Sequence, residues 1–277
     1  MLSQTNKIYS MLQSLKAYSY FTKIRIINNF AYSFELLVRF VSNFLILIIT
    51  VFIWKSAYKN TVSIAEVSQE QMITYSIISI LMVSIYSVRV DRTVNERIRE
   101  GYIAIDFLRP INLLVGWFFD DLGTSTDAFL LTLLPLLIFS IAVIKVPLPS
   151  NLLAFILFLA SVLLSYFILW IITAMTSMIA FWFLELGNLA VVRMHLIRIL
   201  SGSFVPLWFF PQWVQKVSAF LPFVYIYQTP LSIYIGKINV KQAFQSMLIQ
   251  IVWILILSFI LSRIWKKACR MVTVQGG

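Results

Sequence analysis

The sequence predicts an all-α integral membrane protein with six transmembrane helices. Hydrophobic residues make up 60% of its 277 residues and charged residues only 12%, whereas soluble domains contain about 25% charged residues. Several apolar runs reach the roughly 20 residues that cross a bilayer core of about 30 Å. We find no internal repeat and no linker. The whole chain, residues 1–277, is therefore expected to form one membrane domain.

Residues 8–30 are expected to form a helix that lies in the membrane interface. Apolar residues such as Ile8, Met11 and Leu15 recur at helical spacing, and lysines and arginines lie between them. This pattern is typical of an amphipathic helix at the bilayer surface. The six crossings that follow are expected at residues 36–58, 72–88, 122–144, 152–183, 189–210 and 243–262.

Two of these crossings are unusual. Residues 152–183 would form a helix of about 48 Å, which must tilt, bend or protrude from the bilayer. Residues 189–210 contain Arg193, His195 and Arg198. We nevertheless count them as a crossing, because the basic N-terminal and C-terminal segments both favour the cytoplasm and so require an even number of crossings.

The distribution of positive charge sets the orientation of the chain. Most of the 22 lysines and arginines lie on the side of the two termini in this topology, which makes both termini cytoplasmic. The net charge of +11 is explained in this way, so no nucleic-acid partner is expected. A lone Cys269 cannot form an internal disulfide, and a lone His195 cannot build a multi-histidine metal site. The basic residues expected outside are Lys55, Lys59, Lys145, Lys216, Lys237 and Lys241.

Residues 89–113, between the second and third crossings, hold nine charged residues and must therefore stand in water. An apolar stripe runs along this segment at helical spacing. Gly101 and the proline after Arg109 predict two short helices with a bend. The segment is either a docking surface for a soluble partner or a solvated loop with weak ion pairs. The stripe consists of Val94, Ile98, Tyr102 and Ile105.

Residues 205–238 contain four prolines among aromatic residues, and no piece between these prolines is long enough to cross a bilayer. Broken helices at membrane depth require protein or a water-filled cavity beside them. We expect short extracellular or re-entrant helices between the fifth and sixth crossings. The alternative is an interfacial loop anchored by Trp208, Trp213 and tyrosines.

One face of the second crossing carries aromatic rings, a sulfur and a hydroxyl: Tyr75, Ser79, Met82 and Tyr86. This face could contact an amphipathic substrate, although helix packing would use the same residues and is favoured.

The third crossing contains Asp127 about 8 Å inside the membrane. An ionisable residue at that depth is either functional or a carboxylate satisfied near the membrane edge. Asp120 and Asp121 are expected at the water boundary, exposed.

Absent motifs exclude several activities. The sequence has no G-x-x-x-x-G-K-[ST] phosphate loop and no H-E-x-x-H metalloprotease motif. We therefore expect that the chain is not an enzyme and binds no cofactor of its own.

Two segments resemble the permeases of type 2 ATP-binding-cassette (ABC) exporters, in the branch of the daunorubicin and drug-efflux permeases. They are IREGYIAIDFLRPIN at residues 98–112 and LSGSFVPLWFFPQWVQKVSAFLPFVYIYQTPLSIYIG at residues 200–236. The resemblance implies two permease subunits, identical or paralogous, in a bacterial cell membrane. It further implies two copies of a separate cytoplasmic ATPase, which would bind ATP and Mg.

The resemblance also implies roles for particular residues. The charged segment would contain a coupling helix in a groove of the ATPase, through Arg97, Ile98, Arg99, Tyr102, Ile105, Asp106 and Arg109. The second and fifth crossings would line the pathway, and the candidate residues are Tyr75, Ser79, Met82, Tyr86, Asp127, Arg198, Phe204 and Trp208.

The expected cargo is a drug, a peptide or a lipid-like amphipathic molecule. Arg193 and Arg198 argue against a wholly apolar drug cavity, because at least one of them could face the pathway or pair with Glu185, and they admit an anionic or amphipathic cargo. The alternative function is an ion- or proton-coupled secondary transporter, with Asp127 and Arg198 as gating charges.

Overall fold

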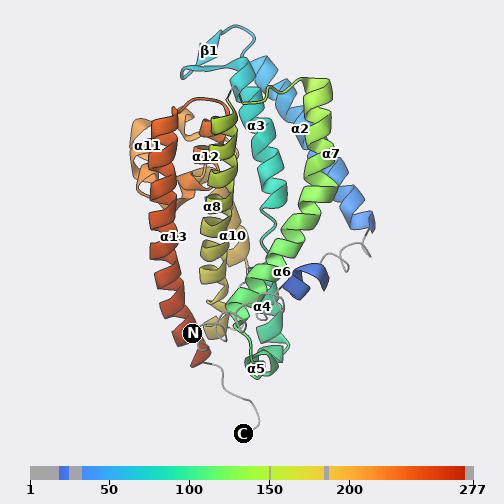
Figure 1. Cartoon of the computed structure of the whole chain (residues 1–277), viewed down its shortest axis with the longest axis vertical. Coiled ribbons are helices and arrows are strands. Elements are labelled where there is room, and N and C mark those ends of the chain that lie inside the picture. Colours follow the sequence, from blue (N-terminus) through green and yellow to red (C-terminus); the bar gives the residue numbers. More distant parts are fainter. Residues whose placement is uncertain (1–18, 25–32, 150, 184–186, 272–277) are drawn as a thin grey trace, which may run out of the picture.

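The computed structural model describes residues 19–24, 33–149, 151–183 and 187–271. Its helices run side by side along one long axis, as an all-α bundle (Figure 1). Two of these helices, α2 (Ser33–Ala57) and α3 (Gln69–Ile85), are joined at one end by an antiparallel hairpin. Its strands, β1 (Ser63–Ile64) and β2 (Val67–Ser68), have two residues each. Residues 19–24 are helical, and the rest of the predicted interfacial helix lies outside the described residues.

Within the described ranges, five helical segments are long and apolar enough to cross a membrane: Phe40–Ala57, Gln69–Arg99, Leu113–Ile144, Leu152–Phe183 and Val240–Cys269. The first lies within α2 (Ser33–Ala57), and the last is α13 (Val240–Cys269). The second contains α3 (Gln69–Ile85). The protein is thus a multi-pass membrane protein.

The expected fifth crossing at residues 189–210 is shorter in the structure. Its helix α10 (Leu189–Leu200) has 12 residues, or about 18 Å, which is less than the bilayer core. The chain turns at Gly202, where φ is +76° and a Cβ would lie 2.7 Å from Gln228 Oε1. The prediction of one helix to residue 210 is therefore wrong, and a sixth crossing stays a prediction.

The third crossing begins nine residues before the predicted position. Asn112 accepts a hydrogen bond from the backbone N–H of Val115 at 3.3 Å and so caps α6 (Leu113–Ala128). The helix continues through the π-helix η1 (Phe129–Leu133), α7 (Leu134–Phe139) and the π-helix η2 (Ser140–Ile144). This earlier start places Asp121 and Asp127 inside the bundle, where both are buried.

The fourth crossing occupies the middle of the bundle. Helix α8 (Leu152–Ser177) ends at a turn, after which α9 (Ala180–Phe183) follows. A turn thus interrupts the helical run of residues 152–183 near its end, and whether the run tilts, bends or protrudes stays a prediction. Helix α8 packs against α13, and it also contacts the neighbouring helices of both ends of the bundle.

The two ends of the bundle differ. At one end lie α4 (Val90–Arg99) and α5 (Tyr102–Phe107), which meet at Gly101 with φ of +76° (Figure 1). The bend expected in residues 89–113 is therefore present. Near the other end lie η3 (Leu207–Phe209), α11 (Gln212–Ala219), η4 (Pro222–Tyr225) and α12 (Gln228–Tyr234). These short helices occupy residues 205–238, and their re-entrant position stays a prediction.

Candidate functional site

The start of α4 is fastened to the membrane helices by Asp121. The carboxylate of this α6 residue accepts hydrogen bonds from the backbone N–H groups of Arg89 (2.8 Å) and Val90 (3.2 Å). It also accepts one from Trp170 Nε1 of α8 at 3.0 Å. Negative charge at a helix N-terminus satisfies unpaired N–H groups and complements the helix dipole. Asp121 therefore joins α4 to α6 and α8.

The sequence predicts an exposed side chain for Asp121, but this side chain is only 1% exposed, so the prediction is wrong. The error follows from starting the helix at residue 122. The signal that could have corrected it is Asn112, a good N-cap residue that comes two positions after Pro110.

A second connection to α4 comes from α10. Arg193 forms an ion pair with Asp91 at 2.7 Å, and both side chains are only 13% exposed. Arg193 also donates to Thr176 Oγ1 of α8 at 2.9 Å. The acidic partner of Arg193 in the structure is therefore Asp91. Glu185, the partner named from the sequence, lies outside the described residues.

A third carboxylate braces the bend between α4 and α5. Asp106 is buried and lies 3.3 Å from Arg97 of α4 and 3.6 Å from Arg109 beyond α5. These two arginines therefore hold the angle between the two short helices. Arg99, in contrast, is exposed at the end of α4.

The apolar stripe of the segment is divided by the bend at Gly101. Val94 is buried, and Ile98 packs against the core. Beyond the bend, α5 turns Ile103 inward and leaves three other apolar side chains exposed. We call these three the α5 patch: Tyr102, Ile105 and Leu108, the last of them 83% exposed. The patch lies at the extreme end of the bundle (Figure 1).

The candidate face of α3 is buried within the subunit: Tyr75, Ser79, Met82 and Tyr86. Tyr75 Oη donates to Gly202 O at 2.8 Å, and Ser79 Oγ donates to Ser203 O at 2.7 Å. This face thus packs on the turn after α10. Its part in a transport pathway stays a prediction.

The other pathway candidates are spread over the molecule. Trp208 contacts the Tyr75 ring edge to face, with centroids 5.1 Å apart, and lies 4.9 Å from Lys237 Nζ. Asp127 is buried in α6. Phe204 and Arg198 are exposed, and Arg198 lies on α10. The structure thus brings Tyr75 and Trp208 into contact.

Comparison with protein families gives one match, to the ABC-2 family of transporter proteins, over residues 44–276. Comparison with curated proteins and comparison with solved structures found no match. The likeness to the daunorubicin branch stays a prediction. Since the match covers most of the chain, including four of the five crossing helices in full, the chain belongs to the ABC-2 transporter family and is a membrane component of an ABC transporter.

Proposed function

We propose that this chain is the permease subunit of an ATP-driven exporter and that a separate cytoplasmic ATPase moves it through the α5 patch. Two permease subunits, identical or paralogous, would pair with two ATPase copies that bind ATP and Mg. The α4 and α5 end would face the cytoplasm of a bacterial cell, as would both termini. The single observation that carries this proposal is the exposed α5 patch on a firmly braced pair of helices.

The bracing favours transfer of force from a partner to the membrane helices. A partner that pulls α5 also pulls α4, because Asp106 holds their angle. Movement of α4 then reaches α6 and α8 through Asp121, and α10 through Arg193. A nucleotide shifts such an equilibrium only if the ATPase binds the two states with different affinity. We propose that this difference in affinity arises at the α5 patch, where the ATPase binds.

The pathway is best placed between two permease subunits. The candidate face of α3 is already covered by protein within one subunit. Helix α10, in contrast, exposes apolar residues such as Val192 and Leu196 together with the charged Arg198. A guanidinium facing lipid is costly, so Arg198 favours a surface that faces a second subunit or an aqueous path. An amphipathic drug, peptide or lipid-like cargo would suit this mixture of apolar and cationic groups.

A pair of aspartate substitutions in the α5 patch tests the proposal. Ile105→Asp with Leu108→Asp should leave membrane insertion unchanged, because both side chains are exposed. The ATPase should no longer co-purify, since two carboxylates would be buried in the contact. The matched control is Val62→Asp, an apolar residue 93% exposed at the opposite end of the bundle. Normal co-purification and normal ATPase stimulation in the double variant would contradict the proposal.

A further inference from the structure

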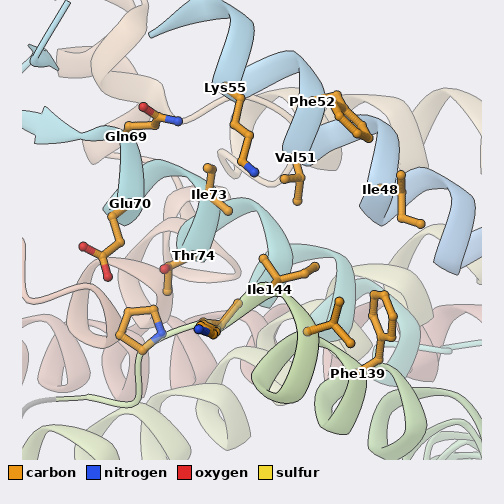
Figure 2. Close-up of a pocket in the computed structure, with 14 residues that line it drawn as sticks. Ile48, Val51, Phe52, Lys55, Gln69, Glu70, Ile73, Thr74, Phe139 and Ile144 are labelled. Carbon is orange, nitrogen blue, oxygen red and sulfur yellow. The ribbon is translucent and has the colours of Figure 1, made fainter. Parts of the chain in front are cut away.

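A cavity of about 650 Å³ opens between α2, α3 and the α7 to η2 helix, at the end of the bundle opposite α5 (Figure 2). Its volume lies within the range of about 300–1,000 Å³ that is typical of small-molecule sites. The deeper walls are apolar, from Ile48 of α2 and Phe139 of α7. Phe52 and Val143 are also exposed on the outside of the bundle. The cavity therefore opens sideways, towards the hydrocarbon of the bilayer.

The rim of this cavity is charged. Lys55 stands in the last turn of α2, Glu70 in the first turn of α3, and Lys145 directly after η2. Figure 2 shows Lys55 extending from α2 towards α3. Among the described residues, none of the ion pairs within 4.0 Å joins Glu70 to either lysine. The rim thus carries a net charge of +1 above an apolar interior, which suits an amphipathic molecule with one negative charge.

The hydroxyl of Thr74 is a second observation that points to a ligand site. Thr74 lines the cavity and is only 3% exposed, yet its Oγ1 has no hydrogen-bond partner among the described residues. Threonines within helices commonly donate to the carbonyl four residues earlier, as Thr50 does to Ile46 here. A buried hydroxyl without a partner destabilises a fold. An oxygen of a bound molecule would remove this cost.

The backbone beside the cavity is also irregular. Lys145 adopts a φ of +61°, a left-handed conformation that residues with a side chain rarely take. It follows the π-helix η2, and π-helical turns are frequent at functional sites. Such strain persists where the surrounding structure enforces it, and it is concentrated at ligand sites. This conformation places Lys145 on the rim of the cavity.

We propose that this cavity binds a membrane phospholipid whose headgroup carries one net negative charge. The phosphate lies between Lys55 and Lys145, and the acyl chains lie against Ile48 and Phe139. Thr74 is one helical turn deeper than Glu70, or about 6 Å. Its hydroxyl is therefore placed to donate to an ester oxygen below the phosphate. The site is separate from the α5 patch, and the proposal does not depend on the identity of the exported cargo.

Native mass spectrometry of the full chain, with the subunits that co-purify, tests this site. The probes are palmitoyl-oleoyl phosphatidylglycerol and palmitoyl-oleoyl phosphatidylcholine, which share acyl chains and differ in headgroup charge. We expect phosphatidylglycerol to bind preferentially, and Lys55→Ala and Lys145→Ala each to weaken its binding about fivefold. Lys59→Ala is the charge control, since Lys59 does not line the cavity. Equal binding of the two lipids by the unmodified chain would overturn the proposal.

Thr74→Val provides a test that does not disturb the fold, because the hydroxyl has no protein partner to lose. It should weaken binding of phosphatidylglycerol several-fold. Thr132→Val is the matched control, because Thr132 is also buried with a hydroxyl that has no partner among the described residues, but lies outside the cavity. Val143→Trp should narrow the cavity from an exposed position. Unchanged lipid binding in both Thr74→Val and Val143→Trp would refute the assignment.

Discussion

Replacing Arg193 by methionine should loosen α4 from the membrane helices. The substitution keeps an unbranched side chain and removes the ion pair with Asp91 at 2.7 Å and the bond to Thr176. Removing one member of a fully buried pair costs about 3–5 kcal/mol. Both side chains here are still 13% exposed, so we discount this to about 2 kcal/mol. The expected fall in the thermal midpoint is about 4–8 °C.

A double-mutant cycle isolates the pair from other effects of the substitution. The cycle consists of Arg193→Met, Asp91→Asn and the double variant, each measured by thermal unfolding of the purified complex. Neutralising both partners removes the uncompensated charge, so the double variant should be more stable than the sum of the single losses indicates. We expect a coupling energy of about 1–2 kcal/mol. Substrate-stimulated ATPase activity should fall in Arg193→Met even where the complex remains folded.

The same helix provides a matched control. Arg92 and Glu96 form an ion pair at 2.8 Å in α4, but their side chains are 74% and 45% exposed. Arg92→Met should therefore change stability by less than about 0.5 kcal/mol. If the cycle at Arg193 gave a coupling energy as small as this control, burial of the pair would not strengthen the link between α4 and α10. Movement of α4 would then not reach α10 through this ion pair.

Two other pairs of substitutions test the turn after α10 and the orientation of the bundle. Gly202→Ala should lower the thermal midpoint more than Gly236→Ala, because both glycines have positive φ but only Gly202 has side-chain oxygens within 3.1 Å of the added Cβ. An equal effect would contradict the importance of this close contact. Trp213→Cys should react with an impermeant thiol reagent from outside the cell, and Leu108→Cys only from the cytoplasmic side, since both side chains are exposed near opposite ends. Reversed labelling would invert the proposed topology.

The class of fold and five apolar crossings could be predicted from the sequence, because length and hydropathy are local properties. The start of the third crossing could not be predicted by the same rule. Carboxylates are costly in hydrocarbon, so Asp120 and Asp121 suggested a boundary. In the structure Asp121 has three hydrogen-bond donors, two of them on the backbone before and within α4. Such compensation depends on tertiary contacts that hydropathy does not register.

The end of α10 was unpredictable for a related reason. Tyr75 Oη bonds to the carbonyl of Gly202, 127 positions away in the sequence. The same region approaches Gln228, so the backbone must turn where a side chain would not fit. An apolar run that continues past residue 200 gives no sign of either contact. The candidate face of α3 likewise has the right spacing for a substrate surface, but within one subunit the hydroxyl groups of Tyr75 and Ser79 donate to carbonyls of this turn.

The contacts of the charged segment bear on the two interpretations that its sequence left open, a docking surface and a solvated loop. A solvated loop would hold its charges in exposed pairs, and Arg92 with Glu96 is such a pair. Asp91, Asp106 and Asp121, however, each bind a different part of the molecule, and all three are largely buried. The segment thus uses its acidic residues to hold its own shape and position, while Tyr102, Ile105 and Leu108 remain exposed. Leaving apolar surface exposed on a rigidly held helix brings no stability to this chain alone, and it is explained if a second protein covers that surface.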